Sequence, residues 1–148
     1  MNVAEREVRA GTVSLPLPQG WEDRTVLTIS GPAIGGIAPN VVVTRETLCD
    51  HMGLGGFASG WLNRLADELP VREDRPVEHG HVAGRRAQIR VVSWSASGAS
   101  VRQLVALFCT EVDAYAVVCT APADAFDVLE PSFRELLAGL RIDQPEGE

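Results

Sequence analysis

Alternating apolar and polar positions mark the first part of the chain as a series of β-strands. Residues 24–30 alternate in this way and are rich in β-branched side chains, which is typical of a strand with one buried face. Residues 12–15 and 40–46 carry the same β-branched enrichment, and Gly31-Pro32 separates the second strand from the third. We therefore expect three strands before the first helix.

Two segments have the 3.6-residue periodicity of amphipathic helices. The first lies between about 56 and 69 and ends at Pro70; its apolar stripe consists of Phe57, Trp61, Leu62, Leu65 and Leu69. The second runs from about 123 to 140, with a stripe of Phe126, Leu129, Phe133, Leu136, Leu137 and Leu140 expected to be buried. Pro131 lies inside this second pattern, which predicts a kink or two short helices.

Four strands are predicted between the helices. Residues 71–81 indicate an outer strand, kept from edge pairing by its charges and Pro76. Residues 87–94 predict a strand with two distinct faces: Ala87, Ile89, Val91 and Ser93 on one, and Arg86, Gln88, Arg90, Val92 and Trp94 on the other. Residues 101–112 and 115–121 are apolar on both faces, as central covered strands are, and form a hairpin about 113–114.

The order strands, helix, four strands, helix predicts an α+β fold, an antiparallel β-sheet sandwiched by helices. The chain has no internal repeat or linker, so we expect a single domain over residues 7–142. Residues 1–6 and 143–148 are then loose termini.

The composition and charge of the chain indicate what class of protein it is. The chain has 148 residues, 45% of them apolar and 22% charged, which is globular composition. Its N-terminus is charged rather than apolar, and no apolar run approaches the roughly 20 residues of a membrane helix. The net charge of −7 disfavours nucleic acid and anionic membrane surfaces. We therefore expect a cytoplasmic protein with no nucleic-acid partner and no stable membrane association.

Two clusters of metal-binding residue types stand out. Cys49 and His51 form one pair, and His79 and His81 form the other. The four side chains suit a tetrahedral zinc site if the segments meet, but their spacing matches no recognised zinc pattern. Polar surface residues are the better interpretation, so we predict no metal; a metalloprotein or hydrolase using Cys49, His79 and His81 is the weakest of three hypotheses.

Other catalytic motifs are weak or absent. Residues 53–58 fit the loose Gly-x-Gly-x-x-Ala dinucleotide pattern, but residues 47–52 separate them from the preceding strand, whereas that chemistry needs a direct strand-to-helix turn. Cys109 and Cys119 lie opposite each other if the hairpin loop has three residues; a disulfide is conceivable there, although buried thiols are favoured in a reducing compartment. We predict a non-enzymatic protein without a cofactor.

Several strings resemble the DcrB-related family: residues 11–16 followed by 18–26, the strand 39–45, and the ending 121–124 with Phe126. The resemblance covers essentially the whole chain and implies a PsbP-like α/β/α sandwich. One cytoplasmic branch of the family, the Eag chaperones of type VI secretion, consists of homodimers that shield the apolar N-terminal helices of effectors. A second branch consists of exported lipoproteins, against which the charged N-terminus argues.

The resemblance implies a chaperone or adaptor that binds apolar helices of a secreted type VI effector; the alternative is a ligand- or protein-binding domain of the same fold with no secretion role. If Leu27 and Ile29 face the core, Val26 and Thr28 face outward, with Val41 and Val43 extending that surface. Two glutamines are expected to hydrogen-bond the guest, and two apolar residues of the 87–94 strand to form a dimer patch. The predicted protein-binding residues are Val26, Thr28, Val41, Val43, Gln88, Val92, Trp94 and Gln103.

Overall fold

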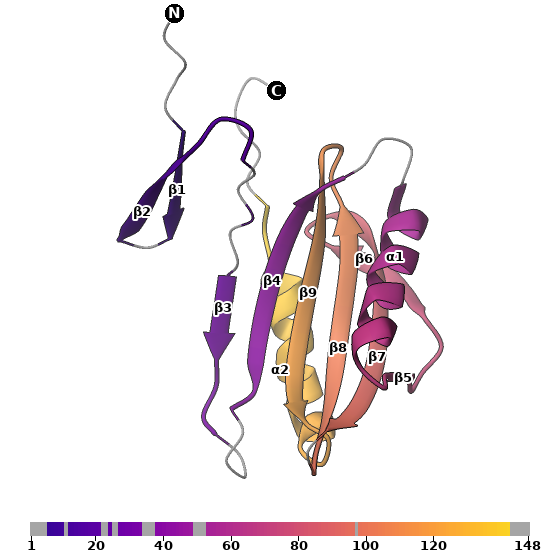
Figure 1. The fold of residues 1–148 in the computed structure, drawn as a ribbon. Coiled ribbons are helices and arrows are strands. Elements are labelled where there is room, and N and C mark those ends of the chain that lie inside the picture. Colours follow the sequence, from indigo (N-terminus) through magenta and orange to yellow (C-terminus); the bar gives the residue numbers. More distant parts are fainter. Residues whose placement is uncertain are drawn as a thin grey trace, which may run out of the picture.

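The computed structural model describes residues 6–10, 12–21, 24, 27–33, 38–48, 53–96 and 98–142. An antiparallel sheet of seven strands lies between two helices, with α1 on one face and α2 on the other (Figure 1). The elements of this sandwich are β3 (Leu27–Ser30), β4 (Asn40–Thr47), α1 (Gly53–Glu68), β5 (Arg72–Glu73), β6 (Glu78–Val82), β7 (Arg85–Ala96), β8 (Ala99–Cys109), β9 (Asp113–Pro122) and α2 (Phe126–Gly139). The predicted α+β sandwich is confirmed.

A separate two-stranded hairpin precedes the sandwich. It consists of β1 (Arg6–Ala10) and β2 (Val13–Leu17), which pair only with each other among the described residues. The second of these strands was predicted, whereas β1 was not. Figure 1 shows the hairpin beside the upper end of β4, away from both helices.

The sheet runs in the order β3-β4-β9-β8-β7, and β5 and β6 both pair with the outer side of β7. Cross-strand neighbours point to the same face of a sheet, so the register shows which side chains of the strands face α1 and which face α2. One row on the α2 face consists of Ile29, Val41, Cys119, Leu104 and Val91. The next row, on the α1 face, consists of Ser30, Asn40, Thr120, Gln103 and Val92.

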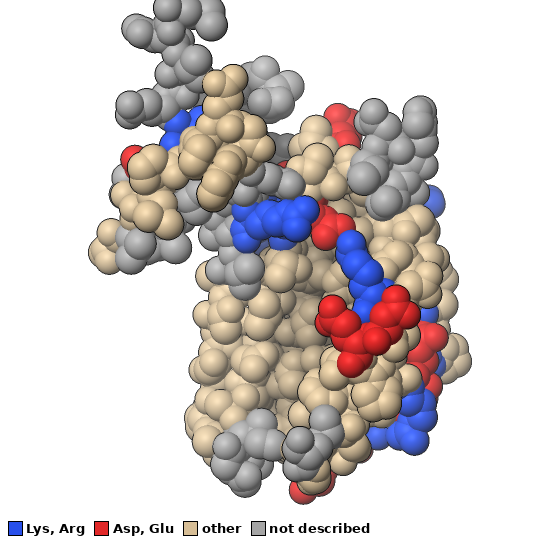
Figure 2. Space-filling view, viewed as in Figure 1, with Lys and Arg blue, Asp and Glu red and all other residues tan. Residues whose placement is uncertain are grey.

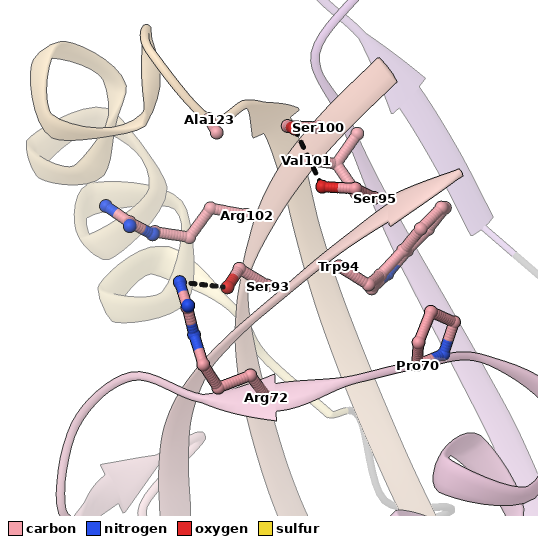
Figure 3. A pocket seen from close by; sticks show the side chains of 9 residues that line it. All are labelled: Pro70, Arg72, Ser93, Trp94, Ser95, Ser100, Val101, Arg102 and Ala123. Atoms are coloured by element: carbon pink, nitrogen blue, oxygen red, sulfur yellow. Dashed lines mark hydrogen bonds between the residues drawn. The ribbon is translucent and has the colours of Figure 1, made fainter. Parts of the chain in front are cut away.

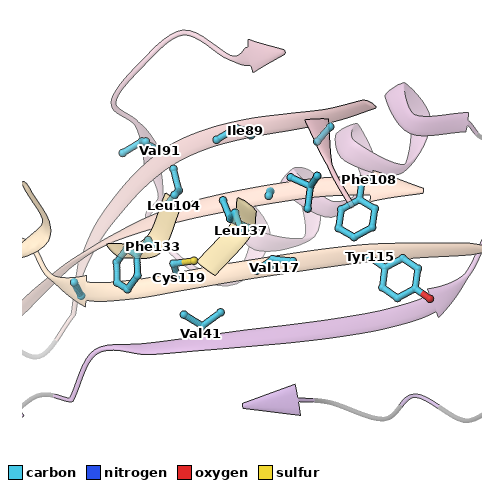
Figure 4. Packing of buried hydrophobic residues seen from close by; sticks show 14 of the residues in the cluster. Val41, Ile89, Val91, Leu104, Phe108, Tyr115, Val117, Cys119, Phe133 and Leu137 are labelled. Atoms are coloured by element: carbon cyan, nitrogen blue, oxygen red, sulfur yellow. The ribbon is translucent and has the colours of Figure 1, made fainter. Parts of the chain in front are cut away.

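The larger core lies between the sheet and α2 (Figure 4). Phe133 and Leu137 of α2 reach down onto Leu104, Val117 and Cys119 of the central strands. At the far end of this core Phe108 and Tyr115 stack, with ring centroids 5.1 Å apart. A smaller core beneath α1 is built from Phe57 and Ala58 of the helix and from Val92, Val105, Leu107, Ala114 and Ala116 of the sheet. Each large apolar side chain buried in this way contributes about 1.5–3 kcal/mol to folding.

The hairpin of β8 and β9 turns three residues earlier than predicted. β8 ends at Cys109, and the Thr110 amide donates to the carbonyl of Asp113, which closes the turn. The register therefore places Cys119 opposite Leu104 and Cys109 opposite Ala114. The two cysteines face different helices, so the expectation that they lie opposite each other is wrong.

The second helix is one continuous element in spite of Pro131. Its expected stripe is buried at Phe126, Phe133 and Leu137, but Leu136 is 45% exposed because it lies beside the edge of the sheet rather than above its centre. The expected burial of Leu136 is therefore wrong. Within the described residues, neither helix is long and apolar enough to span a membrane.

Candidate functional site

Only one half of the α1 face of the sheet is covered by a helix. The short core beneath α1 involves β7, β8 and the start of β9, while β3, β4 and the rest of β9 extend beyond it (Figure 1). Figure 2 shows that the uncovered half is hollowed between the β3–β4 side and α1. We call this surface the trough.

The register of the paired strands shows which side chains line the trough. They are α1-facing side chains of four neighbouring strands: Thr28, Ser30, Asn40, Val42, Thr44, Val118, Thr120 and Gln103. Val118 lies at the inner margin of the trough, where it packs on the core beneath α1. All the residues of the trough have hydroxyl, amide or aliphatic side chains, and the same region of Figure 2 carries neither acidic nor basic colour. The trough therefore offers an uncharged surface on which short polar and β-branched groups alternate.

A hydrogen bond fixes the floor of the trough. The Gln103 side-chain amide donates from Nε2 to the Thr120 hydroxyl across β8 and β9, at 3.0 Å. The other amide atom, Gln103 Oε1, is buried and has no hydrogen-bond partner among the described residues. Gln103 is thus held in one orientation with one acceptor unused.

Charge is confined to the rim. Arg64 of α1 reaches Glu46 of β4 at 3.4 Å and bridges the upper end of the trough. Asp67 and Glu68, further along α1, are exposed. Figure 2 shows acidic and basic side chains gathered along the α1 side and the upper rim of the hollow, so a guest in the trough meets charge only at its margin.

Two of the eight predicted binding residues line the trough, and they do not form a single surface with the others. Thr28 and Gln103 line it, and Val26 lies outside the described residues. Thr28 pairs with Val42, whereas Val41 and Val43 pair with Ile29 and Leu27 and face α2. The expectation that Val41 and Val43 extend the Thr28 surface is therefore wrong, because a strand's neighbours share a face only in the register that the pairing sets.

The assignment of Leu27 and Ile29 to the core is also wrong. Both point toward the α2 face, but they are 63% and 47% exposed. The reason is that β3 is the edge strand, where α2 leaves these side chains partly uncovered. On the other strand, Val41 is buried against the core and Val43 packs on it.

The proposed dimer patch on β7 does not exist in the form expected. Val92 is 0% exposed because α1 packs directly over it. Gln88 is half-buried, and its side chain accepts hydrogen bonds from Arg90, 2.9 Å from Nη2. Sequence periodicity correctly placed these residues on one face but could not show which part of that face the helix covers.

Trp94 lies at the far end of β7, where it lines a separate hollow of about 440 Å³ (Figure 3). Its indole Nε1 is buried without a partner among the described residues. In the same hollow Arg72 donates to the Ser93 hydroxyl at 3.3 Å.

Asp74 forms ion pairs with the two arginines that line that hollow. Arg72 and Arg102 donate to its two carboxylate oxygens at 2.8 and 3.0 Å. Burial acts to raise the pKa of Asp74, but hydrogen bonds from Ser93 and Arg72 and the charges of Arg72 and Arg102 outweigh it and lower the pKa. The arrangement fastens the β5 segment to β7 and β8.

The two histidines lie on β6 and face the α1 side. His79 and His81 line a hollow of about 690 Å³ together with Arg86 and Cys109. Burial raises the pKa of the Cys109 thiol, which disfavours the thiolate that metal binding needs. Cys49 and His51, the other half of the zinc hypothesis, lie outside the described residues; in the described part of the chain no three potential ligands gather around a metal position.

Comparison with known proteins identifies the family of this chain. A family model described as DcrB matches residues 13–138, which is most of the chain. The chain belongs to the DcrB family. The resemblance drawn from its sequence motifs is thereby confirmed at the level of the family.

Solved structures agree on the fold of this DcrB-family protein. It is similar to PA94, a protein of unknown function from Pseudomonas aeruginosa, with 15% identity, a TM-score of 0.77, and coverage of 95% of this chain and 98% of that one. It is also similar to LpqN, involved in cell envelope biogenesis of Mycobacterium tuberculosis, with 18% identity, a TM-score of 0.54, and coverage of 92% and 88%. At these identities the likeness shows the shared fold. No curated protein matches the sequence.

Six trough residues of this DcrB-family chain were not predicted as site residues: Ser30, Asn40, Val42, Thr44, Val118 and Thr120. The alternation of β4 and β9 does put those of β4 and β9 on one face, and their short uncharged side chains were a usable signal. What the sequence lacked was the pairing of β3 with β4 in a register that adds Thr28 and Ser30 to the same face.

Proposed function

We propose that this DcrB-family protein is a non-enzymatic chaperone or adaptor, and that its trough binds an apolar helix of a client protein. The client class suggested by the family resemblance is a secreted effector of type VI secretion, held in the cytoplasm until delivery. The observation that carries the proposal is the uncharged, uncovered half of the α1 face, bounded by α1 on one side.

The chemistry of the trough supports an apolar helix over a charged ligand. A helix satisfies its own backbone hydrogen bonds, so it needs from the trough only close packing and no buried charge. Val42 supplies aliphatic contact in the trough, and its cross-strand neighbour Val118 adds to it at the margin next to α1. A charged ligand would have to leave water for a surface whose described side chains carry no opposite charge, which is costly.

The hydroxyl and amide groups of the trough indicate which kind of apolar helix fits it best. The hydroxyls of Thr28, Thr44 and Thr120 suit a helix that carries small polar side chains among apolar ones. Such side chains hydrogen-bond between packed helices inside membranes, and the trough offers equivalent partners before insertion. A wholly aliphatic helix would leave these groups without partners.

We also propose that the protein works as a homodimer, as the family branch does. The burial of Val92 removes the β7 patch as the interface, so the proposal rests on the resemblance. Light scattering tests it: the expected mass is twice the 15.9 kDa of one chain, and a monomer mass at high concentration contradicts it.

The client site is tested with a matched pair of substitutions at Thr28, which is exposed and therefore tolerant of change. Thr28→Val keeps the shape and lacks charge, whereas Thr28→Asp places a carboxylate against the guest. Tagged protein is purified from its own cells, and co-purifying chains are quantified by mass spectrometry. The expected result is that proteins with an apolar N-terminal segment accompany wild type and Thr28→Val and fall at least about tenfold with Thr28→Asp.

A third variant, Val112→Asp, controls for added charge, because Val112 lies on the exposed turn between β8 and β9. It should keep the client. If Thr28→Asp retains the same apolar-segment proteins while its thermal melt is unchanged, the trough is not the site. If wild type captures only partners without such segments, the alternative of a binding domain with no secretion role is supported instead.

A further inference from the structure

A second surface of the molecule lies on the other side of the sheet, at the outer edge of β3. A groove of about 360 Å³ opens there between β3, β4 and α2, a size within the range of specific ligand pockets. Its lining is almost wholly apolar and includes Ile29, Pro32, Pro39, Val41, Leu129, Phe133 and Leu136. We call this surface the edge groove.

Large apolar side chains stay exposed around the edge groove. Leu27 and Ile29 of β3 and Leu136 of α2 are each between 45% and 63% exposed. Leu27 and Ile29 are two residues apart on one strand, so both point toward the groove side. Covering such side chains stabilises a complex by about 25 cal/mol for each Å² removed from water.

The backbone of β3 adds a second feature. β3 pairs with β4 on one side, and no described residue pairs with the amide and carbonyl groups of its other edge. Sheets usually protect such edges with charges, prolines or short strands. The opposite edge does so: β5 has two residues, both charged, and Pro76 separates it from β6. β3 is also short, with four residues, but it carries no charge and no proline.

These two features fit one kind of ligand. We propose that the edge of β3 and the edge groove bind an extended, uncharged segment of a partner protein, which pairs with β3 as an additional strand. Main-chain hydrogen bonds to β3 hold such a segment, and its alternate side chains, which face α2, enter the groove. Those side chains are apolar, because the groove would desolvate a charge without pairing it. The groove lies on the α2 side of the sheet and the trough on the α1 side, with Ser30 and Asn40 bordering both. The proposal does not rest on the trough.

The probe is a short capped synthetic peptide that alternates threonine with leucine and isoleucine. Its binding to the full chain is followed by fluorescence anisotropy. We expect binding to wild type and at least about tenfold weaker binding to Ile29→Lys and Leu136→Glu, because each places a charge in the groove. Val112→Glu, which changes an apolar residue with 66% exposure far from the groove, should bind like wild type.

A second peptide separates strand pairing from simple apolar contact. It has the same side chains but is N-methylated at alternate backbone amides, which removes hydrogen-bond donors, and it should not bind. Equal binding of both peptides, equal binding to all variants, or no binding to wild type overturns the proposal. A homodimer that Ile29→Lys converts to monomer also overturns it, because the edge then belongs to a second copy of the chain. Thermal melts of each variant confirm that the fold is retained.

Discussion

Gln103 and Thr120 face each other across β8 and β9, and the Gln103 amide donates to the Thr120 hydroxyl at 3.0 Å. The pair forms the floor of the trough, and it leaves Gln103 Oε1 buried without a partner among the described residues. A buried acceptor without a hydrogen bond costs about 1–3 kcal/mol. The unpaired acceptor of Gln103 is therefore expected to lower the free energy of unfolding by a measurable amount.

Gln103→Met removes that acceptor and keeps the length of the side chain. We expect the free energy of unfolding to change by less than about 1 kcal/mol, since the lost hydrogen bond is offset by the removal of an unsatisfied atom. Gln103→Glu, which buries a charge in the same place, should destabilise by more. Urea denaturation of both variants measures this. A large loss of stability in Gln103→Met would show that Oε1 does have a partner.

Val92→Ala distinguishes a core residue from an interface residue. Val92 is fully buried beneath α1, so removing its methyl groups should cost about 2 kcal/mol of unfolding free energy and leave the oligomeric state unchanged. Val112→Ala, at an exposed position, should cost almost nothing. Denaturation together with light scattering tests both statements. If Val92→Ala changed the mass of the oligomer but not the free energy of unfolding, Val92 would be an interface residue rather than a core residue.

Glu130 anchors α2 to the β5–β6 segment. Arg75 donates to both of its carboxylate oxygens at 2.7 and 2.8 Å, and Arg134 donates to one of them at 3.0 Å. The hydrogen bonds from Arg75 lower the pKa of Glu130 from 4.5 to about 2, against the opposing effect of burial and with further help from Arg134.

A carboxylate with a depressed folded-state pKa stabilises the protein above its unfolded pKa, and this contribution is lost as the pH falls. For Glu130 the window runs from about pH 4.5 to about pH 2, and a shift of this size corresponds to about 3 kcal/mol. Glu130→Gln should therefore be less stable than wild type at pH 7, with the difference shrinking across this window. Glu135→Gln, on the same helix, controls for the loss of one carboxylate. A difference that stays constant with pH would contradict the assignment.

The sequence predicted most elements and the two faces of β7, because apolar stripes and alternation are local properties. It did not predict where α1 lies across the sheet, and that position decides that Val92 is buried while Val42 is open. It also did not predict how β3 pairs. A shift of one residue would have placed Val41 beside Thr28, so the trough could be assigned only once the register was known.

Cys119 should be chemically inert in the folded protein. Burial raises the pKa of its thiol to about 12, so the reactive thiolate is almost absent at neutral pH. Alkylation with iodoacetamide, followed by peptide mass spectrometry, should label Cys119 only after denaturation. Labelling at the rate of a free thiol in the native protein would show that the core beneath α2 opens readily.

The central claim is that the trough holds an apolar helix of a client protein. Its most direct test is site-specific photo-crosslinking in living cells, with a benzophenone amino acid in place of Thr28 and, as control, in place of Val112. We expect Thr28 to crosslink to a client peptide inside an apolar stretch of roughly 20 residues, the length of a membrane-spanning helix, and Val112 not to crosslink to it. Crosslinks from Thr28 only to polar, non-helical segments, or equally from both positions, would contradict the claim.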